Sequence, residues 1–296
     1  MLAPIVLFVY NRLWHTQQTI DALLKNELAK DSKLYIYADA AKKKENITDV
    51  EKVREYIKTI NGFFDVEIIE REYNYGLANS IIDGVTNVVN KYGKIIVLED
   101  DLVTSPYFLN YMNEGLELYE DEDKVACIHG YTFPVSELNR TFFIKGTDCW
   151  GWATWSRAWD IFDEDGAKLL SELEDKKLTE DFDFDNTYPY TKMLRDQIIG
   201  KNDSWAIRWR AAAYLKDMLT LYSAESYIQN IGNDNSGTHS DKTDDFSVKL
   251  LEKHHRLGKI KIIEDEDARI KIGYFYDKIR PSFFKKVNAK IKSILK

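Results

Sequence analysis

Short apolar runs alternate with longer amphipathic stretches through the first hundred residues. The apolar runs are 4–10 (PIVLFVY), 33–39 (KLYIYAD), 64–70 (FDVEIIE) and 94–99 (KIIVLE). Helical stretches lie between them, at about 16–30, 46–60 and 77–91. Unbroken apolar strands separated by helices are typical of a parallel sheet covered on both faces. The pattern therefore predicts an α/β fold with a doubly wound, mainly parallel, Rossmann-like sheet and helices on both faces.

The second half of the chain has a less regular pattern. We expect helices at 105–119 and 203–217 and strands at 124–130 and 141–145. Ser105 is placed to cap the first of these helices, with Pro106 at its first position, and Asp203 is a candidate cap for the second. The segment 146–160 carries four of the seven tryptophans. If it is helical, Trp152, Trp155 and Trp159 share one face.

The last 21 residues, 276–296, differ in charge from the rest of the chain. They carry seven Lys or Arg and one Asp, whereas the whole chain has a net charge of −8. After Pro281, apolar residues recur at three- and four-residue spacing, which predicts a C-terminal basic amphipathic helix. Such a helix suits an anionic membrane surface, here through 279–296. Docking on the acidic body of the protein or on a partner subunit is the open alternative.

The composition is that of a soluble globular protein, with 44% hydrophobic and 30% charged residues. No stretch reaches the ~20 apolar residues of a membrane helix, and the first residues lack the basic n-region of a signal peptide. The acidic balance argues against a nucleic-acid partner. Two cysteines, Cys127 and Cys149, are too few for a disulfide framework. A cytoplasmic location is therefore expected.

Polar residues follow each strand of the predicted sheet. They are Tyr10-Asn11-Arg12, Asp39, the segment 74–80 with Gly76, and Glu99-Asp100-Asp101. Ligands of open parallel sheets bind beyond the carboxyl ends of the strands. Three adjacent acids either form a solvated turn or hold a cation, and hard carboxylate oxygens suit Mn²⁺ or Mg²⁺. The chain has no GxxxxGK[ST] loop, no GxGxxG turn after its first strand, and no GxSxG, HExxH or CxxC motif.

The segments PIVLFVYNR, YIYAD, NYGLANS and VLEDDLVTSPYFLNYM resemble, in this order, segments of GT-A fold glycosyltransferases. The EDD version of the DXD motif, followed by L-x-x-[ST/A]-P-x-F, is most similar to the N-acetylglucosaminyltransferase I group. The likeness covers about residues 3–240. It implies a metal-dependent, inverting transferase over 1–275, with a nucleotide-binding half at 1–101 and an acceptor-binding half at 102–275. The implied donor is a UDP-sugar, with GlcNAc as one candidate, and the implied acceptor is a glycan or lipid-linked glycan hydroxyl in surface polysaccharide assembly.

The resemblance also implies roles for residues near the strand ends. Arg12 and Asp39 would contact the uracil or a phosphate, and Asp101 would ligate Mn²⁺ or Mg²⁺. Glu99 and Asp100 would contact the ribose or metal-bound waters. Tyr10, Asn74, Gly76 and Asn79 are further donor-binding candidates.

Later segments supply the remaining candidates. NDSW (202–205) resembles the segment with the catalytic base, which places Asp203 in that role; the family has two adjacent acids before the tryptophan, whereas this chain has Asp203-Ser204-Trp205. GNDNSGTH (232–239) resembles a loop that closes over the donor, and His239 is either a metal ligand or a solvated residue. Trp150, Trp152 and Trp205 are the candidates for sugar contact, with a core position as the alternative.

Two other functions fit parts of this pattern. A sugar nucleotidyltransferase can have the same type of sheet, but these enzymes usually have a glycine- and arginine-rich loop after the first strand, where this chain reads YNRLWHTQQ. A non-catalytic sugar- or nucleotide-binding module with the same fold is the second alternative.

Overall fold

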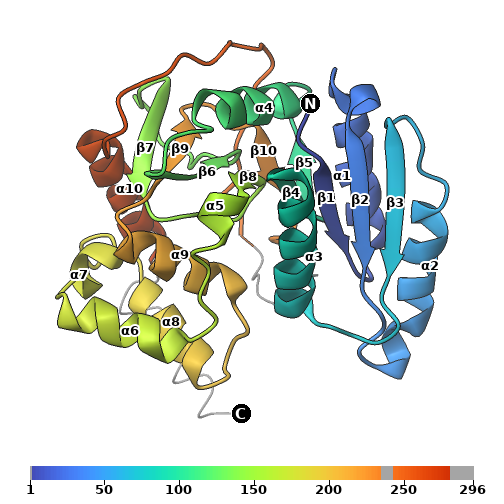
Figure 1. Ribbon diagram of the computed structural model, residues 1–296, viewed down its shortest axis with the longest axis horizontal. Coiled ribbons are helices and arrows are strands. Elements are labelled where there is room, and N and C mark those ends of the chain that lie inside the picture. Colours follow the sequence, from blue (N-terminus) through green and yellow to red (C-terminus); the bar gives the residue numbers. More distant parts are fainter. Residues whose placement is uncertain (1, 235–242, 281–296) are drawn as a thin grey trace.

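The computed structural model describes residues 2–234 and 243–280, in which one large mixed sheet forms the centre of the molecule (Figure 1). Its strand order is β3-β2-β1-β4-β8-β6-β9-β7. Within the described residues, four of the seven strand pairings are parallel and three are antiparallel. The predicted α/β fold with a mainly parallel sheet is thus confirmed.

The four strands predicted in the first hundred residues are present, each within one residue of its expected bounds. They are β1 (Ile5–Val9), β2 (Lys33–Ala38), β3 (Asp65–Glu70) and β4 (Lys94–Glu99). All of their mutual pairings are parallel. Their carboxyl ends therefore meet at one edge of the sheet, as the row of polar residues requires.

Helices cover both faces of this parallel block. One face packs against α1 (Leu13–Leu24) and α2 (Ile47–Ile57), and the other against α3 (Leu77–Tyr92). α4 (Phe108–Leu118) lies on the same side as α1, against β6 and β8. α1 ends six residues earlier than expected, because Asn26 leaves the helix. The side-chain Nδ2 of Asn26 donates to the Ala22 carbonyl at 3.2 Å, and the side-chain Oδ1 accepts from the Leu109 N–H at 3.0 Å.

The tryptophan-rich segment is a strand, β8 (Trp152–Trp155), followed by the short helix α5 (Ser156–Trp159). The expected helical face was wrong. β8 lies antiparallel between β4 and β6, and residues three apart in a strand point to opposite faces. Trp152 therefore packs on the α3 side of the sheet, and Trp155 packs on the α4 side, where its indole donates to the Leu116 carbonyl.

The remaining described elements complete the second half. They are β5 (Leu102–Thr104), β6 (Val125–His129), β7 (Thr141–Lys145), α6 (Gly166–Asp175), α7 (Thr179–Phe182), α8 (Tyr190–Ile198), α9 (Trp205–Leu215), β9 (Leu219–Ser223), β10 (Ile228–Asn230) and α10 (Glu266–Ile279). β5 and β10 form a separate two-stranded sheet directly after Asp101.

Two expected helix caps were wrong. α4 begins at Phe108, so Ser105 and Pro106 precede it, and the Ser105 hydroxyl donates to the Leu251 carbonyl at 2.7 Å. α9 is capped by Ser204, whose Oγ accepts from the Ile207 N–H at 3.2 Å. Asp203 lies before the cap, so its side chain does not cap α9.

The C-terminal segment is described only as far as residue 280. α10 continues across the expected boundary at 275 and ends at Ile279. The amphipathic helix expected after Pro281, and most of the segment 279–296, lie outside the described residues. No helix among the described residues has the length and apolar character needed to cross a lipid bilayer.

Candidate functional site

Arg12 lies between two carboxylates at the carboxyl ends of β1 and β4. The pairing of Phe8 with Glu99 sets the two strand ends side by side. Arg12 Nη2 donates to Asp100 Oδ1 and, at 2.7 Å, to Asp101 Oδ2. Burial opposes the charge of Arg12, but the two carboxylates outweigh burial and raise its pKa. One guanidinium thus links two of the three acids.

The three acids carry more negative charge than Arg12 compensates. Burial, together with Asp101 and Asp100, raises the pKa of Glu99 to about 8. Burial also raises the pKa of Asp100 to about 6, although Arg12 works against it. Asp100 Oδ2 is buried without a hydrogen-bond partner. A further cation at this edge would relieve both the repulsion and the unpaired oxygen.

The backbone around Asp101 is held by segments far away in the sequence. The Asp101 carbonyl accepts from the Ile231 N–H at 2.9 Å, and the Asp100 carbonyl accepts from Thr19 Oγ1 at 2.8 Å. Gly232 then lies directly against the Asp101 carboxylate, where a Cβ would overlap it. A glycine at this position leaves room for the Asp101 carboxylate.

Asp39 is the centre of a hydrogen-bond network that shapes the start of α3. Its Oδ1 accepts from the Ala40 and Tyr75 N–H groups at 2.9 and 2.8 Å. Its Oδ2 accepts from the Gly76 N–H at 3.0 Å and from Asn74 Nδ2 at 2.9 Å. These four bonds use the acceptor capacity of the carboxylate. Asp39 therefore holds the 74–76 loop against the sheet edge, a role that the sequence did not reveal.

The other donor-binding candidates of the first half are Tyr10, Asn79 and Gly76. The Tyr10 hydroxyl donates to Asn46 Oδ1 at 3.3 Å and accepts from the Lys42 N–H at 3.0 Å. Asn79 Nδ2 donates to the Tyr75 carbonyl. Gly76 precedes α3 with φ of 73°, a conformation that favours glycine. The structure thus brings the sequence-predicted residues of the first half to one edge.

The tryptophan candidates do not share one environment. Trp152 and Trp205 are 1% and 3% exposed and stack on each other at 5.4 Å between ring centroids. Together with Trp159 and Trp209 they form a core cluster, so their expected role in sugar contact is corrected to packing. Trp150 is only partly buried, and its ring contacts Tyr131 at 4.8 Å between centroids.

Asp203 is exposed and lies two residues before α9. Its side chain is 69% exposed, with Arg208 Nη2 at 4.0 Å from its Oδ1. The following Trp205 packs on Trp152, which pairs with Val97 of β4. The start of α9 is thus connected to the carboxyl-terminal part of β4 through two indole rings. His239, the second expected metal ligand, lies outside the described residues.

The described residues fit a divalent cation in chemistry, though they do not form a complete site. Among them, no group of three or more His, Cys, Asp and Glu side chains is arranged to hold a metal. The fit rests on hard carboxylate oxygens and on the buried Asp100 Oδ2 that has no partner. Sequence reasoning had not singled out Gly232, although it had identified the segment that Gly232 opens.

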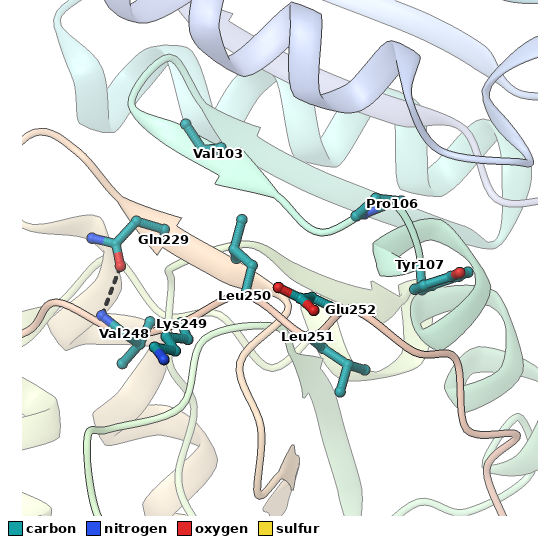
Figure 2. Close-up of a pocket in the computed structure, with 9 residues that line it drawn as sticks. All are labelled: Val103, Pro106, Tyr107, Gln229, Val248, Lys249, Leu250, Leu251 and Glu252. Carbon is teal, nitrogen blue, oxygen red and sulfur yellow. Dashed lines mark hydrogen bonds between the residues drawn. The ribbon is translucent and has the colours of Figure 1, made fainter.

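A separate hollow of about 690 Å³ lies beside β5 and β10 (Figure 2). Its lining is Val103, Pro106, Tyr107, Gln229 and the segment 248–252. Within it, Gln229 Oε1 accepts from the Val248 N–H at 2.7 Å. None of the sequence-predicted site residues lines this hollow, which is therefore distinct from the acid-rich sheet edge.

Comparisons with known proteins found similarity only among solved structures. No family model and no curated protein matches the chain. The crystal structure of S. aureus TarS 1–349 is 11% identical with a TM-score of 0.42, over 77% of this chain and 60% of that chain. A second S. aureus TarS structure is 12% identical with a TM-score of 0.40, over 79% of this chain and 37% of that chain.

The mannosyltransferase PcManGT from Pyrobaculum calidifontis, solved in complex with GDP-Man and Mn²⁺, is 11% identical with a TM-score of 0.35. That match covers 72% of this chain and 69% of the mannosyltransferase. This chain spans less than two thirds of each TarS chain. These similarities concern the arrangement of sheet and helices.

Proposed function

We propose that this protein is a glycosyltransferase that uses a nucleotide-sugar donor and a divalent cation. The observation that carries the proposal is the edge at which Arg12, Glu99, Asp100 and Asp101 meet. Two of the three carboxylates, Asp100 and Asp101, share one guanidinium there, and one oxygen of Asp100 is buried without a partner. A metal bound to a diphosphate would supply the positive partner that these carboxylates lack. The EDD segment that resembles the GT-A motif supplies the same acids.

Each residue at this edge would contact a different part of the donor. Asp101 would hold Mn²⁺ or Mg²⁺, and Glu99 and Asp100 would contact the ribose or metal-bound water. Arg12 would contact a phosphate. The loop 74–76, held by Asp39, would form the wall beside the nucleotide. The bound cation would offset the negative charge that develops on the departing diphosphate.

Asp203 remains the proposed base of an inverting transfer. In this step its carboxylate takes the proton of an acceptor hydroxyl as the hydroxyl oxygen bonds to the anomeric carbon. The bond from that carbon to the diphosphate breaks on the opposite face, and the diphosphate leaves with the electron pair. Because Ser204 caps α9, the carboxylate of Asp203 is not committed to the helix.

The finer parts of the proposal are the identity of the substrates and the location of the enzyme. We propose UDP as the nucleotide, GlcNAc as one candidate sugar, and a glycan or lipid-linked glycan of surface polysaccharide assembly as the acceptor. Contact of 279–296 with the inner face of the cell membrane would fit a lipid-linked acceptor. Co-sedimentation with anionic vesicles, with and without that segment, tests this part; equal binding by both chains would refute it.

Calorimetry with UDP in the presence and absence of Mn²⁺ tests the main proposal. We expect Mn²⁺-dependent binding, its loss in Asp101→Ala, and its retention in Asp49→Ala, which changes an exposed acid of α2. A donor-hydrolysis assay then separates the alternatives. Binding without turnover would favour a binding module, and release of pyrophosphate from UTP and a sugar phosphate would favour a nucleotidyltransferase. Unchanged UDP affinity in Asp101→Ala would refute the metal assignment.

A further inference from the structure

The first turns of α1 face the acid-rich edge. Residues 12, 15 and 19 lie three and four positions apart, so they share one side of the helix. Arg12 Nη2 donates to Asp100 and Asp101, and Thr19 Oγ1 donates to the Asp100 carbonyl at 2.8 Å. His15 lies between these two contacts and is 6% exposed. His15 is thus buried on the side of α1 that holds the acids, although none of the roles assigned above includes it.

His15 contacts Asp234, a residue that follows β10. Its Nε2 lies 3.1 Å from Asp234 Oδ2. An ionised carboxylate only accepts hydrogen bonds, so the His15 ring donates in this pair. The ring of Trp14 meets the His15 ring edge-on, with 4.9 Å between the centroids and 89° between the planes. A buried ring between a carboxylate and an indole has little freedom to turn, so its donor is directed at Asp234.

Asp234 belongs to the segment 231–234, which lies against the Asp101 carboxylate. The Ile231 N–H donates to the Asp101 carbonyl at 2.9 Å. A Cβ on Gly232 would lie 2.8 Å from Asp101 Cγ, so the backbone at Gly232 and the carboxylate are in contact. The segment is thus bonded to the acid-rich edge at Ile231 and to α1 at Asp234, with Gly232 between the two bonds.

α1 therefore acts on the Asp101 carboxylate in two ways. Arg12 donates to Asp101 Oδ2 directly, at 2.7 Å. His15 acts through Asp234, because the bond between them limits how far Gly232 can move relative to the carboxylate. A ligand that is already held in place binds a cation without a further cost of ordering. His15 is thus connected to the proposed metal ligand through two other residues.

We propose that His15 is a positioning residue of the donor site: through Asp234 it holds the segment 231–234 against Asp101 and keeps the Asp101 carboxylate in place for Mn²⁺ or Mg²⁺. The inference rests on the proposed function in that the cation belongs to the nucleotide-sugar donor site. His15 need not touch the cation or the donor. A role in stability alone would leave the cation affinity of the folded protein unchanged, so measurement can separate the two roles.

Hydrogen exchange of the Ile231 amide, followed by NMR in the full-length, metal-free protein, tests the first step. This amide is bonded to the Asp101 carbonyl, so its exchange reports local opening of the segment 231–234. We expect it to exchange about tenfold faster in His15→Leu, because a hydrogen bond to a charged group is lost. His15→Gln, whose side-chain amide can donate to Asp234, should restore a rate near that of the wild type.

Calorimetric titration with Mn²⁺ in the presence of UDP tests the second step. We expect half-saturation at an about fivefold higher Mn²⁺ concentration in His15→Leu, and near the wild-type concentration in His15→Gln. Asp234→Ala should match His15→Leu, and the double variant should bind no more weakly than either, because both changes break the same bond. The Asp234 side chain is 43% exposed, so Asp234→Ala serves as the test if His15→Leu does not fold.

The pair of His254 and Glu114 supplies a matched control. His254 Nε2 lies 2.9 Å from Glu114 Oε1, and Glu114 belongs to α4 instead of α1. His254→Leu therefore removes the same kind of bond at another helix. It should change neither the exchange rate of the Ile231 amide nor the Mn²⁺ concentration at half-saturation.

Three results would overturn the proposal. The first is an Ile231 exchange rate in His15→Leu and Asp234→Ala that equals the wild type. The second is an unchanged Mn²⁺ concentration at half-saturation in these variants, which would leave the pair a role in stability alone. The third is a double variant in which the two single effects add. A wild-type protein that does not bind UDP with Mn²⁺ refutes the proposed function and, with it, the role of His15 in cation binding; that outcome is distinct because it is read from the wild type alone.

Discussion

Gly232 and Asp101 are in direct contact, and a Cβ built on Gly232 would lie 2.8 Å from Asp101 Cγ and closer still to Oδ2. Gly232→Ala must therefore displace the carboxylate or the backbone after β10. We expect Mn²⁺-dependent UDP affinity to fall by about tenfold or more, which corresponds to about 1.4 kcal/mol. Gly258→Ala, at a glycine with open space around it, is the control. Equal UDP affinity in the two variants would show that the Asp101 carboxylate is not needed for binding.

Asp203→Asn separates catalysis from helix capping. Ser204 caps α9, so the Asn variant should keep its stability while its kcat falls by about 10²-fold, as is typical for loss of a general base. Ser204→Ala should show the reverse, with a loss of about 1 kcal/mol in the free energy of unfolding and little change in kcat. Steady-state kinetics and urea unfolding measure both quantities. Wild-type transfer rates in Asp203→Asn would place the base elsewhere.

Asp39→Asn should weaken the loop that borders the proposed nucleotide site. One oxygen of the carboxylate would become an amide donor facing either the Tyr75 and Ala40 N–H groups or the Gly76 N–H and Asn74 Nδ2. We expect a loss of about 1–3 kcal/mol in the free energy of unfolding, because buried donors lose their acceptor. UDP affinity should fall with it. The control is Asp49→Asn at an exposed position, and an equal stability of the two variants would contradict the assigned role.

Glu99 should make the metal-free protein less stable as the pH rises. Its pKa is raised from 4.5 to about 8 in the folded state. Between these values the unfolded chain has released the proton that the folded chain still holds, so the free energy of unfolding decreases with increasing pH. Above pH 8 the free energy of unfolding is lowered by the full cost of ionising Glu99 in the folded protein. Urea unfolding between pH 5 and pH 8 should show a smaller decrease for Glu99→Gln.

A variant at an exposed acid of α2, Glu51→Gln, is the control for this pH series. It should keep the wild-type dependence, because its carboxylate is in solvent. Addition of Mn²⁺ should reduce the wild-type decrease, since a bound cation favours the ionised carboxylates. Parallel pH profiles for the wild type and Glu99→Gln would contradict the assignment of the raised pKa.

The first half of the fold was predictable because β1, β2 and β4 are buried on both faces and the helices between the strands have clear periodicity. The strand ends then meet at one edge whatever the side-chain details, so Arg12 and the three acids were expected together. The partners of Asp39 were not predictable. They depend on the backbone conformation of the 74–76 loop, to which the sequence points only through Gly76.

The second half was harder to predict from the sequence, because its apolar pattern fits both the period of a helix and the period of a strand. Trp152, Trp155 and Trp159 match a helical face as well as they match a strand followed by a turn of helix. Tertiary pairing with β4 and β6 decided the outcome. The same limit applies to the hydrogen bond from Arg210 to the Thr147 carbonyl, which joins residues 63 positions apart.

The position of β8, antiparallel between β4 and β6, also affects how the chain folds during its synthesis. The strands β3, β2, β1 and β4 are contiguous in sequence and can pair as soon as β4 has left the ribosome. One side of β4 then stays open until β8 is made, and it presents the backbone of Ile95, Ile96 and Val97. An unpaired apolar edge of this kind is a template for pairing with another chain. Nascent chains that stop between β4 and β8 should therefore be the species that aggregate.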